Sequence, residues 1–276
     1  MPNRLSQPTQ YRGKLQAVIL DWAGTAVDYG SLAPVRTLER VFARADVALT
    51  DSEIRRAMGL PKKDPIREIL SIPRVRNEWA RVHRNLPCET DVERLYDDFV
   101  PLQFSCLLEY SAIIPGVVEA LERFRIRGLK IGTTTGYTRE MLDLLVEASK
   151  KAGYVPDCSL APGDVGAGRP LPFKIYENAV RLRVYPLPAI VKIGDTAADI
   201  QEGLNAGAWS IGVAATGNVM GLSQQEFGAL GASEREERLV VARAELRRVG
   251  AHYVVDSLAD VDAALDDIDT RLNSAD

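Results

Sequence analysis

The sequence predicts an α/β protein, a Rossmann-like parallel sheet core with an inserted helical cap domain. Two apolar runs bounded by turn residues, near 15–22 and at 189–195, indicate buried strands, and a third run at 129–136 joins them. Each run is followed by a segment with helical periodicity. This alternation is typical of a parallel sheet, in which loops gather at the carboxyl ends of the strands and form the ligand-binding edge.

The segment from about 32 to 111 has helical periodicity and little strand character, as in APVRTLERVFARADV and DVERLYDDFVPLQFSCLLEY. It predicts a helical cap domain over 32–110, inserted into an α/β core domain made of 15–31 and 111–270. Both ends of the insertion would lie near the carboxyl end of the first strand, where it can cover a site. The charged segment 232–250 indicates a solvated helix.

Composition excludes several classes of function. The chain has 276 residues, of which 46% are apolar and 26% charged, and its formal net charge is -4. The lack of a basic bias predicts no nucleic-acid partner, and no apolar run is long enough to span a bilayer, so no membrane partner is expected. Residues 1–14 are polar, lack the apolar stretch of a signal peptide, and are expected to be a disordered lead-in. Three widely spaced cysteines without a CxxC pattern indicate reduced thiols and a cytoplasmic location.

Acidic side chains follow two of the predicted strands. Asp21 ends the first run, in AVILDWAGT, and Asp195 ends the run at 189–195, with Asp199 about one helical turn further on. A single aspartate in such a place is usually a helix cap. Several carboxylates at one sheet edge repel each other, and a hard divalent cation with oxygen ligands relieves that repulsion. The three aspartates therefore predict a metal site, with Mg²⁺ as the cofactor.

Two further signals point to a phosphoryl group. The run at 129–136 ends in Thr133-Thr134-Thr135-Gly136, whose hydroxyls and backbone N–H groups are suited to hold phosphate oxygens. Arg169, in GRP at 168–170, is a cation suited to a tetrahedral oxyanion, although an arginine in a loop is by default exposed. Each signal is weak by itself, and their order along the chain makes them strong together.

That order resembles a known family. DWAGT at 21–25, TTTGYT at 133–138, GRPLPFKIY at 168–176 and GDTAADIQEGLNAG at 194–207 look like the four motifs of the haloacid dehalogenase superfamily. Within it the chain is similar to the phosphonatase (phosphonoacetaldehyde hydrolase) family, from about residue 15 to 268. MGLPKKDPIREIL at 58–70 looks like the segment that carries the Schiff-base lysine of that family.

The resemblance implies a role for each motif. Asp21 would be the nucleophile, and Mg²⁺ would be bound by Asp21, the backbone carbonyl of Ala23, and Asp195. Asp199 would either bind the metal directly or hold a residue that does. The transferring phosphoryl oxygens would be bound by Thr135, Gly136 and Arg169.

Ala23 predicts the kind of bond that is broken. In the phosphatases of the superfamily a second aspartate at this position protonates a leaving alkoxide, and its absence forfeits a general acid worth roughly 10²- to 10⁴-fold. Cleavage of a P–O bond is therefore disfavoured. A leaving carbon needs an electron sink, which a protonated imine between a lysine and a neighbouring aldehyde provides. The resemblance assigns that lysine to Lys62; on sequence chemistry alone Lys63, or neither, could be the amine.

The implied reaction is hydrolysis of the P–C bond of phosphonoacetaldehyde to acetaldehyde and phosphate, through a lysine imine and an aspartyl-phosphate. Met58 and Tyr137 would line the substrate pocket. Pro65 departs from the family, which usually has histidine there, and His83 and His252 match no family catalytic position. Proton transfer would use water or another group such as Tyr137, which is equally plausible as a packed aromatic, or the substrate has changed.

Two other functions stay open. One is a related hydrolase that acts on a different phosphonate or a phosphate ester, which Pro65 motivates. The other is a catalytically silent homologue that serves as a binding or assembly module, which the intact acidic motifs disfavour. The expected partner is a small phosphonate substrate, and the family implies a homodimer through the cap domain.

Overall fold

The computed structural model describes residues 11–60 and 63–274. Within these residues six strands form one parallel sheet in the order β3-β2-β1-β4-β5-β6. The strands are β1 (Ala17–Leu20), β2 (Lys130–Thr134), β3 (Cys158–Leu160), β4 (Ile190–Gly194), β5 (Trp209–Val213) and β6 (Tyr253–Val255). The three strands predicted from the sequence are β1, β2 and β4, which lie side by side, and the predicted α/β fold class is confirmed.

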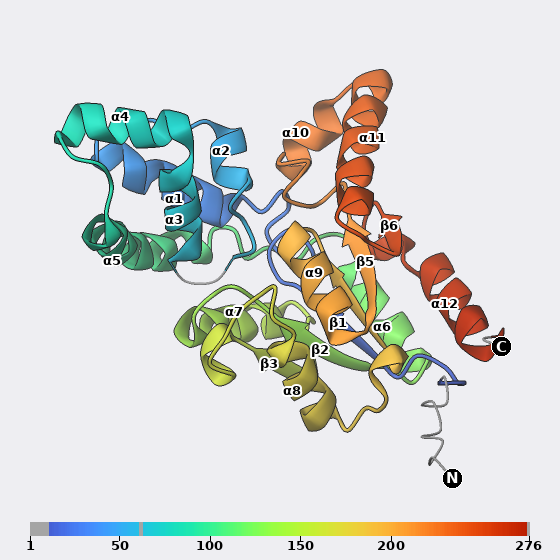
Figure 1. Ribbon diagram of the computed structural model, residues 1–276. Coiled ribbons are helices and arrows are strands. Elements are labelled where there is room, and N and C mark those ends of the chain that lie inside the picture. Colours follow the sequence, from blue (N-terminus) through green and yellow to red (C-terminus); the bar gives the residue numbers. More distant parts are fainter. Residues whose placement is uncertain (1–10, 61–62, 275–276) are drawn as a thin grey trace, which may run out of the picture.

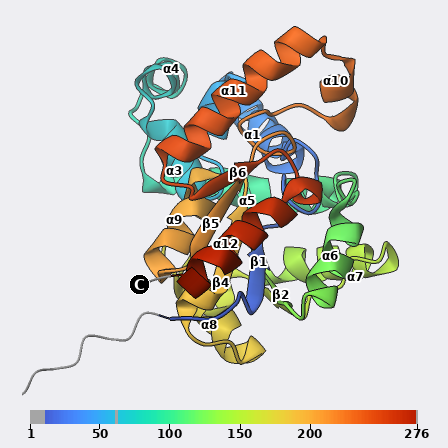
Figure 2. The same cartoon turned by 90° about the vertical axis from the view of Figure 1, so that its right-hand side faces the viewer.

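Helices cover both faces of the sheet (Figures 1 and 2). Those outside the insertion are α6 (Val117–Ile126), α7 (Arg139–Lys151), α8 (Phe173–Leu182), α9 (Ala197–Ala206), α10 (Gln224–Ala229), α11 (Ala232–Arg248) and α12 (Asp262–Ser274). Strand β1 shows why its sequence is continuously apolar. Val18 and Leu20 pack into the core that includes α6 and α12, whereas Ala17 and Ile19 pack toward α8. A strand buried on both faces has no polar side to present to water.

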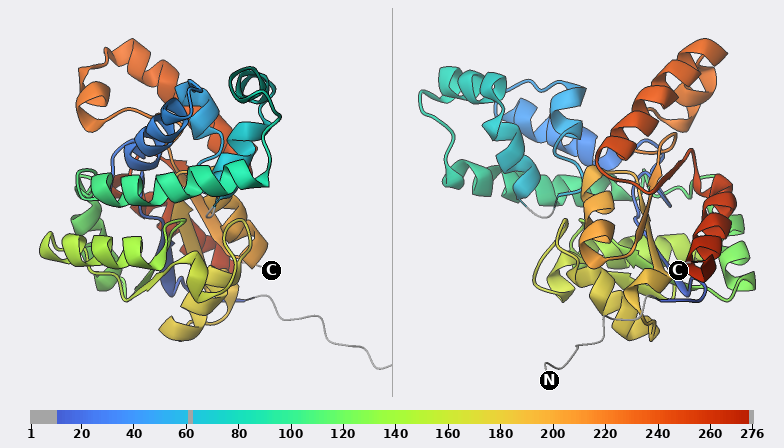
Figure 3. Two further views of the ribbon diagram at one scale, coloured as in Figure 1. Left: turned by 90° about the vertical axis from the view of Figure 1, so that its left-hand side faces the viewer. Right: turned by 45° about the vertical axis from the view of Figure 1, so that its right-hand side comes forward.

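The inserted segment forms a helical lobe with a hydrophobic core of its own (Figures 1 and 3). Its helices are α1 (Leu32–Arg44), α2 (Asp51–Arg55), α3 (Asp64–Ser71), α4 (Pro73–His83) and α5 (Glu89–Leu107). Phe42, Ile69 and Trp79 lie at the centre of that core, fully buried. Because a segment with its own core behaves as a domain, we propose the helical lobe as the cap domain, with 32–110 as its bounds.

The position of β1 decides where a ligand can bind. Leu20 pairs with Thr133 on one side and with Ile193 on the other, so the loops after β1, β2 and β4 begin next to each other. The chain builds the sheet outward in opposite directions from β1 and β4, and the crevice at such a reversal is the usual binding site of an open α/β sheet.

Three further expectations from the sequence concern the lead-in, the charged segment and membrane spans. The expected disordered lead-in, 1–14, lies largely outside the described residues, and Tyr11 packs against the core. Segment 232–250 is helical as predicted, and Leu239, Ala242 and Leu246 of α11 are its buried residues. Among the described residues, none of the helices combines the length and the apolar character that a membrane span needs.

Candidate active site

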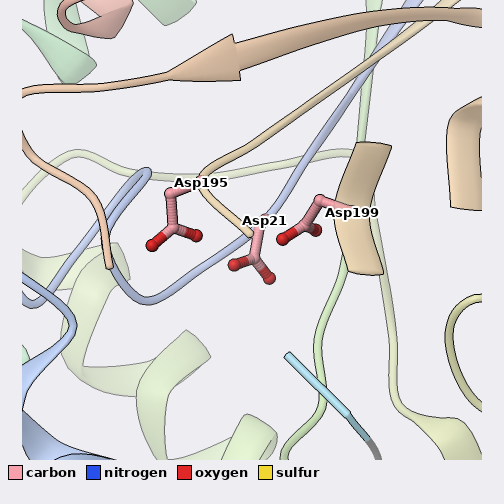
Figure 4. Close-up of side chains that lie close together, drawn as sticks. All are labelled: Asp21, Asp195 and Asp199. Carbon is pink, nitrogen blue, oxygen red and sulfur yellow. The ribbon is translucent and has the colours of Figure 1, made fainter. Parts of the chain in front are cut away.

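Three aspartates meet at the carboxyl edge of the sheet, at the point where the strand order reverses. Asp21 follows β1, Asp195 follows β4, and Asp199 lies in the first turn of α9. One carboxylate oxygen of each lies within 4.8 Å of the other two, and all three residues are buried. Figure 4 shows the three carboxylates side by side. These aspartates could hold a metal ion, as the positions of the strand ends predicted.

Glycines make room for Asp195. A Cβ atom on Gly24, which has a φ of +76°, would lie 2.1 Å from Asp195 Oδ2, and one on Gly217 would lie 2.5 Å from Asp195 Cβ. A side chain at either position would displace the carboxylate of Asp195. This close approach explains why a glycine follows Ala23 in the DWAGT segment.

The environment of Asp195 and Asp21 favours a cation. Burial, and then repulsion from Asp21 and Asp199, raises the pKa of Asp195 well above its usual range. Burial likewise raises the pKa of Asp21. Asp195 Oδ2 accepts a hydrogen bond from the Asn218 backbone N–H at 2.7 Å, whereas the buried Oδ1 has no partner. A buried carboxylate oxygen without a donor, beside a second carboxylate, fits a hard divalent ion with oxygen ligands.

Asp199 differs from the other two because cations already lie against its Oδ1 atom and a hydroxyl is bonded to its Oδ2 atom. Oδ1 lies 2.7 Å from Lys192 Nζ and 3.0 Å from Arg169 Nη1, and Oδ2 accepts a hydrogen bond from Thr196 Oγ1 at 2.5 Å. Although burial by itself raises the pKa of Asp199, attraction by Arg169 and Lys192 lowers it to about 2. Of the two roles left open for Asp199, this geometry favours a partner that holds the site over a direct ligand.

Arg169 is buried against Asp21 instead of being exposed in its loop. Nη2 donates to Asp21 Oδ1 at 2.5 Å and to the Thr134 carbonyl at 2.7 Å. Nε donates to Glu202 Oε2 at 3.1 Å. Nε and Nη2 have hydrogen-bond acceptors and Nη1 forms an ion pair with Asp199 Oδ1, so the plane of the guanidinium is held in one orientation at the nucleophile position.

A buried charge network lies behind Arg169, and the sequence did not reveal it. Glu202 on α9 accepts a hydrogen bond from Thr134 Oγ1 at 2.9 Å, and its Oε1 lies 3.3 Å from Lys174 Nζ. Lys192 of β4 lies 2.7 Å from Asp199 Oδ1. We call Arg169, Lys174, Lys192, Asp21, Asp199 and Glu202 the buried charge network. The sequence analysis singled out Asp21, Asp199 and Arg169 but not their pairing, and of the other three members only Lys192 is conspicuous, as a lysine inside the apolar run AIVKIGD.

Lys174 makes the stability of this network depend on pH. Burial lowers the pKa of Lys174 to about 8, and an unfolded lysine has a pKa of about 10.4. Between these values the unfolded chain binds more protons, so the stability from this site rises with pH. We expect the free energy of unfolding of the native chain, minus that of Lys174→Met, to increase between pH 7 and pH 10 in urea titrations. A difference that is constant with pH would contradict this assignment.

The predicted threonines have separate partners. Thr133 Oγ1 accepts a hydrogen bond from Trp22 Nε1 at 2.9 Å, and Thr134 belongs to the contacts of Arg169 and Glu202. Thr135 lies at the cavity, where its Oγ1 accepts a hydrogen bond from the Tyr137 backbone N–H at 3.1 Å. Of the three hydroxyls, that of Thr135 is therefore the one placed to meet a ligand.

A cavity with a volume of about 90 Å³ lies between the core and the helical lobe. Its polar side is formed by Asp21, Thr135, Gly136, Arg169 and Asp195, and the helical lobe contributes apolar side chains. Ala23, Met58 and Tyr137, the predicted pocket residues, all line it, as does Pro65. Burial raises the pKa of Tyr137 well above its usual value, so its hydroxyl stays protonated.

Among the described residues, the remaining lysine and histidine candidates lie outside the lining of the cavity. Lys62 lies outside the described residues. Lys63 Nζ pairs with Glu93 Oε1 at 2.6 Å, and Lys63 lines a separate groove with Arg67 and Gly168. His83 lies 2.9 Å from the Ala45 carbonyl. His252 accepts a hydrogen bond from the Ser210 backbone N–H. Neither histidine is among the described residues that line the cavity.

Comparison with known proteins agrees with this geometry. The family model of haloacid dehalogenase-like hydrolases matches residues 18–213, and the chain belongs to this family of hydrolases. Its relatives include the phosphonoacetaldehyde hydrolase of Bacillus cytotoxicus, which is 43% identical over 258 residues, 94% of this chain and 98% of that protein. The phosphonoacetaldehyde hydrolase of Syntrophobacter fumaroxidans is 43% identical over 263 residues, 95% of each chain.

A solved structure extends the comparison to the whole fold. The crystal structure of a phosphonoacetaldehyde hydrolase-like protein from Oleispira antarctica has a TM-score of 0.95 and 36% sequence identity, and the match covers 99% of both chains. The family resemblance predicted from the four motifs is confirmed.

Proposed function

We propose that this chain hydrolyses the P–C bond of phosphonoacetaldehyde to acetaldehyde and phosphate. The observation that carries the proposal is Ala23, which lines the cavity two residues after Asp21. Among the described lining residues only Asp21 and Asp195 are carboxylates, so the site offers no further carboxylic acid to protonate a leaving alkoxide. Relatives at 41–43% identity carry the name phosphonoacetaldehyde hydrolase, which supports the same substrate.

The reaction uses two covalent steps on protein groups. Lys62 condenses with the aldehyde to form an imine and releases water. Asp21 attacks phosphorus, the P–O bond to its carboxylate forms as the P–C bond breaks, and the electron pair of that bond passes into the protonated imine to give an enamine. The enamine is protonated at carbon and its imine is hydrolysed to release acetaldehyde. Water then hydrolyses the aspartyl-phosphate and regenerates Asp21.

Arg169, Thr135 and Gly136 bind and neutralise the transferring phosphoryl oxygens. The guanidinium of Arg169 is oriented by its acceptors in the core, and its hydrogen bond to Asp21 holds it beside the nucleophile. Gly136 lies at the boundary between the core and the helical lobe, where a Cβ atom would come into ordinary contact with the Leu60 carbonyl at 3.4 Å.

Mg²⁺ is the proposed cofactor, held by Asp21, the carbonyl of Ala23 and Asp195. When bound, it neutralises the charge shared by the carboxylates and the phosphonate, so that two anions can approach each other. The unpartnered Oδ1 of Asp195 is the feature of this chain that supports the assignment.

Lys62 is the proposed amine, and the surroundings of Lys63 support this choice. Lys63 is paired with Glu93 and lies 5.6 Å from the centre of the Tyr96 ring, in a groove other than the cavity. An amine held against a carboxylate is less available to attack an aldehyde than one without such a partner.

Pro65 is the residue that motivates a second candidate function. It lines the cavity and fits the first turn of α3, where its missing N–H costs no hydrogen bond. Because proline cannot transfer protons, the alternative function is hydrolysis of another phosphonate or of a phosphate ester.

The family further suggests a homodimer through the cap domain. The free thiols of Cys88, Cys106 and Cys158 suit the cytoplasm.

The experiment that tests the function is acetaldehyde release from phosphonoacetaldehyde, followed with a coupled alcohol dehydrogenase. We expect release by the native chain with Mg²⁺, its loss with a chelator, and a fall on the order of 10³-fold or more in Lys62→Ala. Lys63→Ala is the matched control and should retain most of the activity. Borohydride should trap the substrate on the native chain and not on Lys62→Ala.

Three other outcomes of this experiment would change the proposed amine or the proposed substrate. Release that survives Lys62→Ala but not Lys63→Ala would move the amine to Lys63. Release that survives both substitutions would reject the imine. If the native chain binds Mg²⁺ but releases no acetaldehyde, Pro65 marks a change of substrate, and a panel of phosphonates and phosphate esters becomes the next assay.

A further inference from the structure

Arg55 belongs to the helical lobe, where Nε donates to Asp51 Oδ2 at 2.5 Å, but its Nη1 and Nη2 atoms donate to the core. Its side chain is 9% exposed, although α2 is a short helix at the edge of the lobe. Nη1 donates to the Gly30 carbonyl at 2.9 Å, and Nη2 donates to the Gly221 carbonyl at 2.9 Å. Gly30 lies just before α1, and Gly221 lies in the loop after β5. One guanidinium therefore joins the lobe to two separate segments of the core.

Asn218 connects this contact to the carboxylate cluster. Its Nδ2 donates to the Arg55 carbonyl at 3.1 Å, and its own carbonyl accepts from Arg55 Nη1 at 3.2 Å. Its backbone N–H donates to Asp195 Oδ2 at 2.7 Å. Asn218 thus touches the helical lobe with its side chain and carbonyl, and touches the proposed metal carboxylate with its N–H.

The loop around Asn218 is closely fitted at both ends. A Cβ on Gly221, which has a φ of +67°, would lie 2.5 Å from Arg55 Nε. A Cβ on Gly217 would lie 2.5 Å from Asp195 Cβ. The loop therefore contacts Arg55 closely at one end and Asp195 closely at the other.

A second contact between lobe and core reaches the same cluster. A Cβ on Gly59 would lie 2.4 Å from Thr196 Oγ1, and that hydroxyl donates to Asp199 Oδ2 at 2.5 Å. The segment from Arg55 to Gly59, which leads to Lys62, therefore rests on residues that hold Asp195 and Asp199.

We propose that Arg55 and Asn218 couple the seating of the helical lobe to divalent-metal binding at Asp195. The Asn218 N–H holds one oxygen of Asp195 and so aims the unpartnered Oδ1. Lobe contact strengthens metal binding, and by reciprocity metal binding strengthens lobe contact. Arg55 and Asn218 are positioning residues, since both act through Asp195. The inference rests on the metal site of the proposed function and is independent of which substrate is cleaved.

The first test measures metal affinity without any substrate. Mn²⁺ serves as the probe, and electron paramagnetic resonance counts the free ion. We expect Arg55→Ala to raise the dissociation constant of Mn²⁺ by about five- to tenfold, the range of a modest coupling. Arg56→Ala is the matched control: this neighbour is exposed, its nearest anion is Glu68 at 3.4 Å, and the substitution should leave the constant unchanged. Thermal unfolding establishes that both variants are folded.

The second test measures the reverse effect, which a purely structural anchor would not show. Hydrogen exchange in segment 51–60 should slow when Mn²⁺ is added to the native chain, and this response should disappear in Asn218→Ala. Unchanged Mn²⁺ affinity in Arg55→Ala, together with a metal response that persists in Asn218→Ala, would reduce Arg55 to a simple anchor. A native chain that binds no Mn²⁺ would overturn both the metal site and the coupling. Normal coupling without acetaldehyde release would reject only the substrate.

Discussion

Asp21→Asn is expected to abolish turnover and leave the fold intact. The amide has the shape of the carboxylate but cannot form the aspartyl-phosphate. We therefore expect kcat to fall by about 10⁴-fold or more, the size of the loss when an enzyme's catalytic nucleophile is removed. Asp143→Asn, a substitution of an exposed aspartate on α7, is the control and should keep full activity. Acetaldehyde release and acid-quench detection of phosphoenzyme provide the two measurements.

The same variant should not be destabilised. Burial raises the pKa of Asp21, which means that the folded chain pays a cost for the charged form at neutral pH. Asparagine removes that charge and the repulsion from Asp195 and Asp199, at the expense of the ion pair with Arg169. We expect a melting temperature without Mg²⁺ equal to or above that of the native chain. A variant that retains turnover would exclude Asp21 as the nucleophile.

Among the substitutions proposed for testing, Glu202→Gln is expected to lower the free energy of unfolding the most. Glu202 is fully buried and pairs with Arg169 and Lys174, while Lys192 lies 3.8 Å from Oε2. Removing this charge leaves three buried cations facing Asp21 and Asp199. Breaking a buried pair on one side costs about 3–5 kcal/mol, because the partner stays buried without compensation. Urea titration at pH 7 measures the loss.

Two controls separate this electrostatic effect from packing. Glu245→Gln removes an exposed partner of Arg248 and should change the free energy of unfolding by less than about 1 kcal/mol. The double variant Glu202→Gln, Lys174→Met removes one cation and one anion together, so it should recover part of the lost stability. If Glu202→Gln unfolds like the native chain, the buried charge network does not contribute as we infer.

The sequence by itself determined the sheet's central strands and the acidic edge. The apolar runs that form buried strands can be recognised from neighbouring residues alone. Because parallel strands end at the same edge of the sheet, Asp21, Asp195 and Asp199 could be assigned to one site before any contact was known. Ala23 was equally readable, since its meaning lies in the absence of an acid two residues after Asp21. Four ordered motifs were enough to indicate the family. The role of Lys62 stays a prediction.

Only the tertiary structure decided which charged residues are buried. Glu202 and Arg55 sit on helices where a charged side chain normally faces water, and Lys192 is a charged residue inside an apolar strand, whose partners the local pattern does not reveal. Their burial is the sum of contacts with residues up to 166 positions away in the chain, such as Gly221 for Arg55. The sequence reports a residue's own chemistry and its neighbours, whereas desolvation and charge pairing depend on what the fold brings around it.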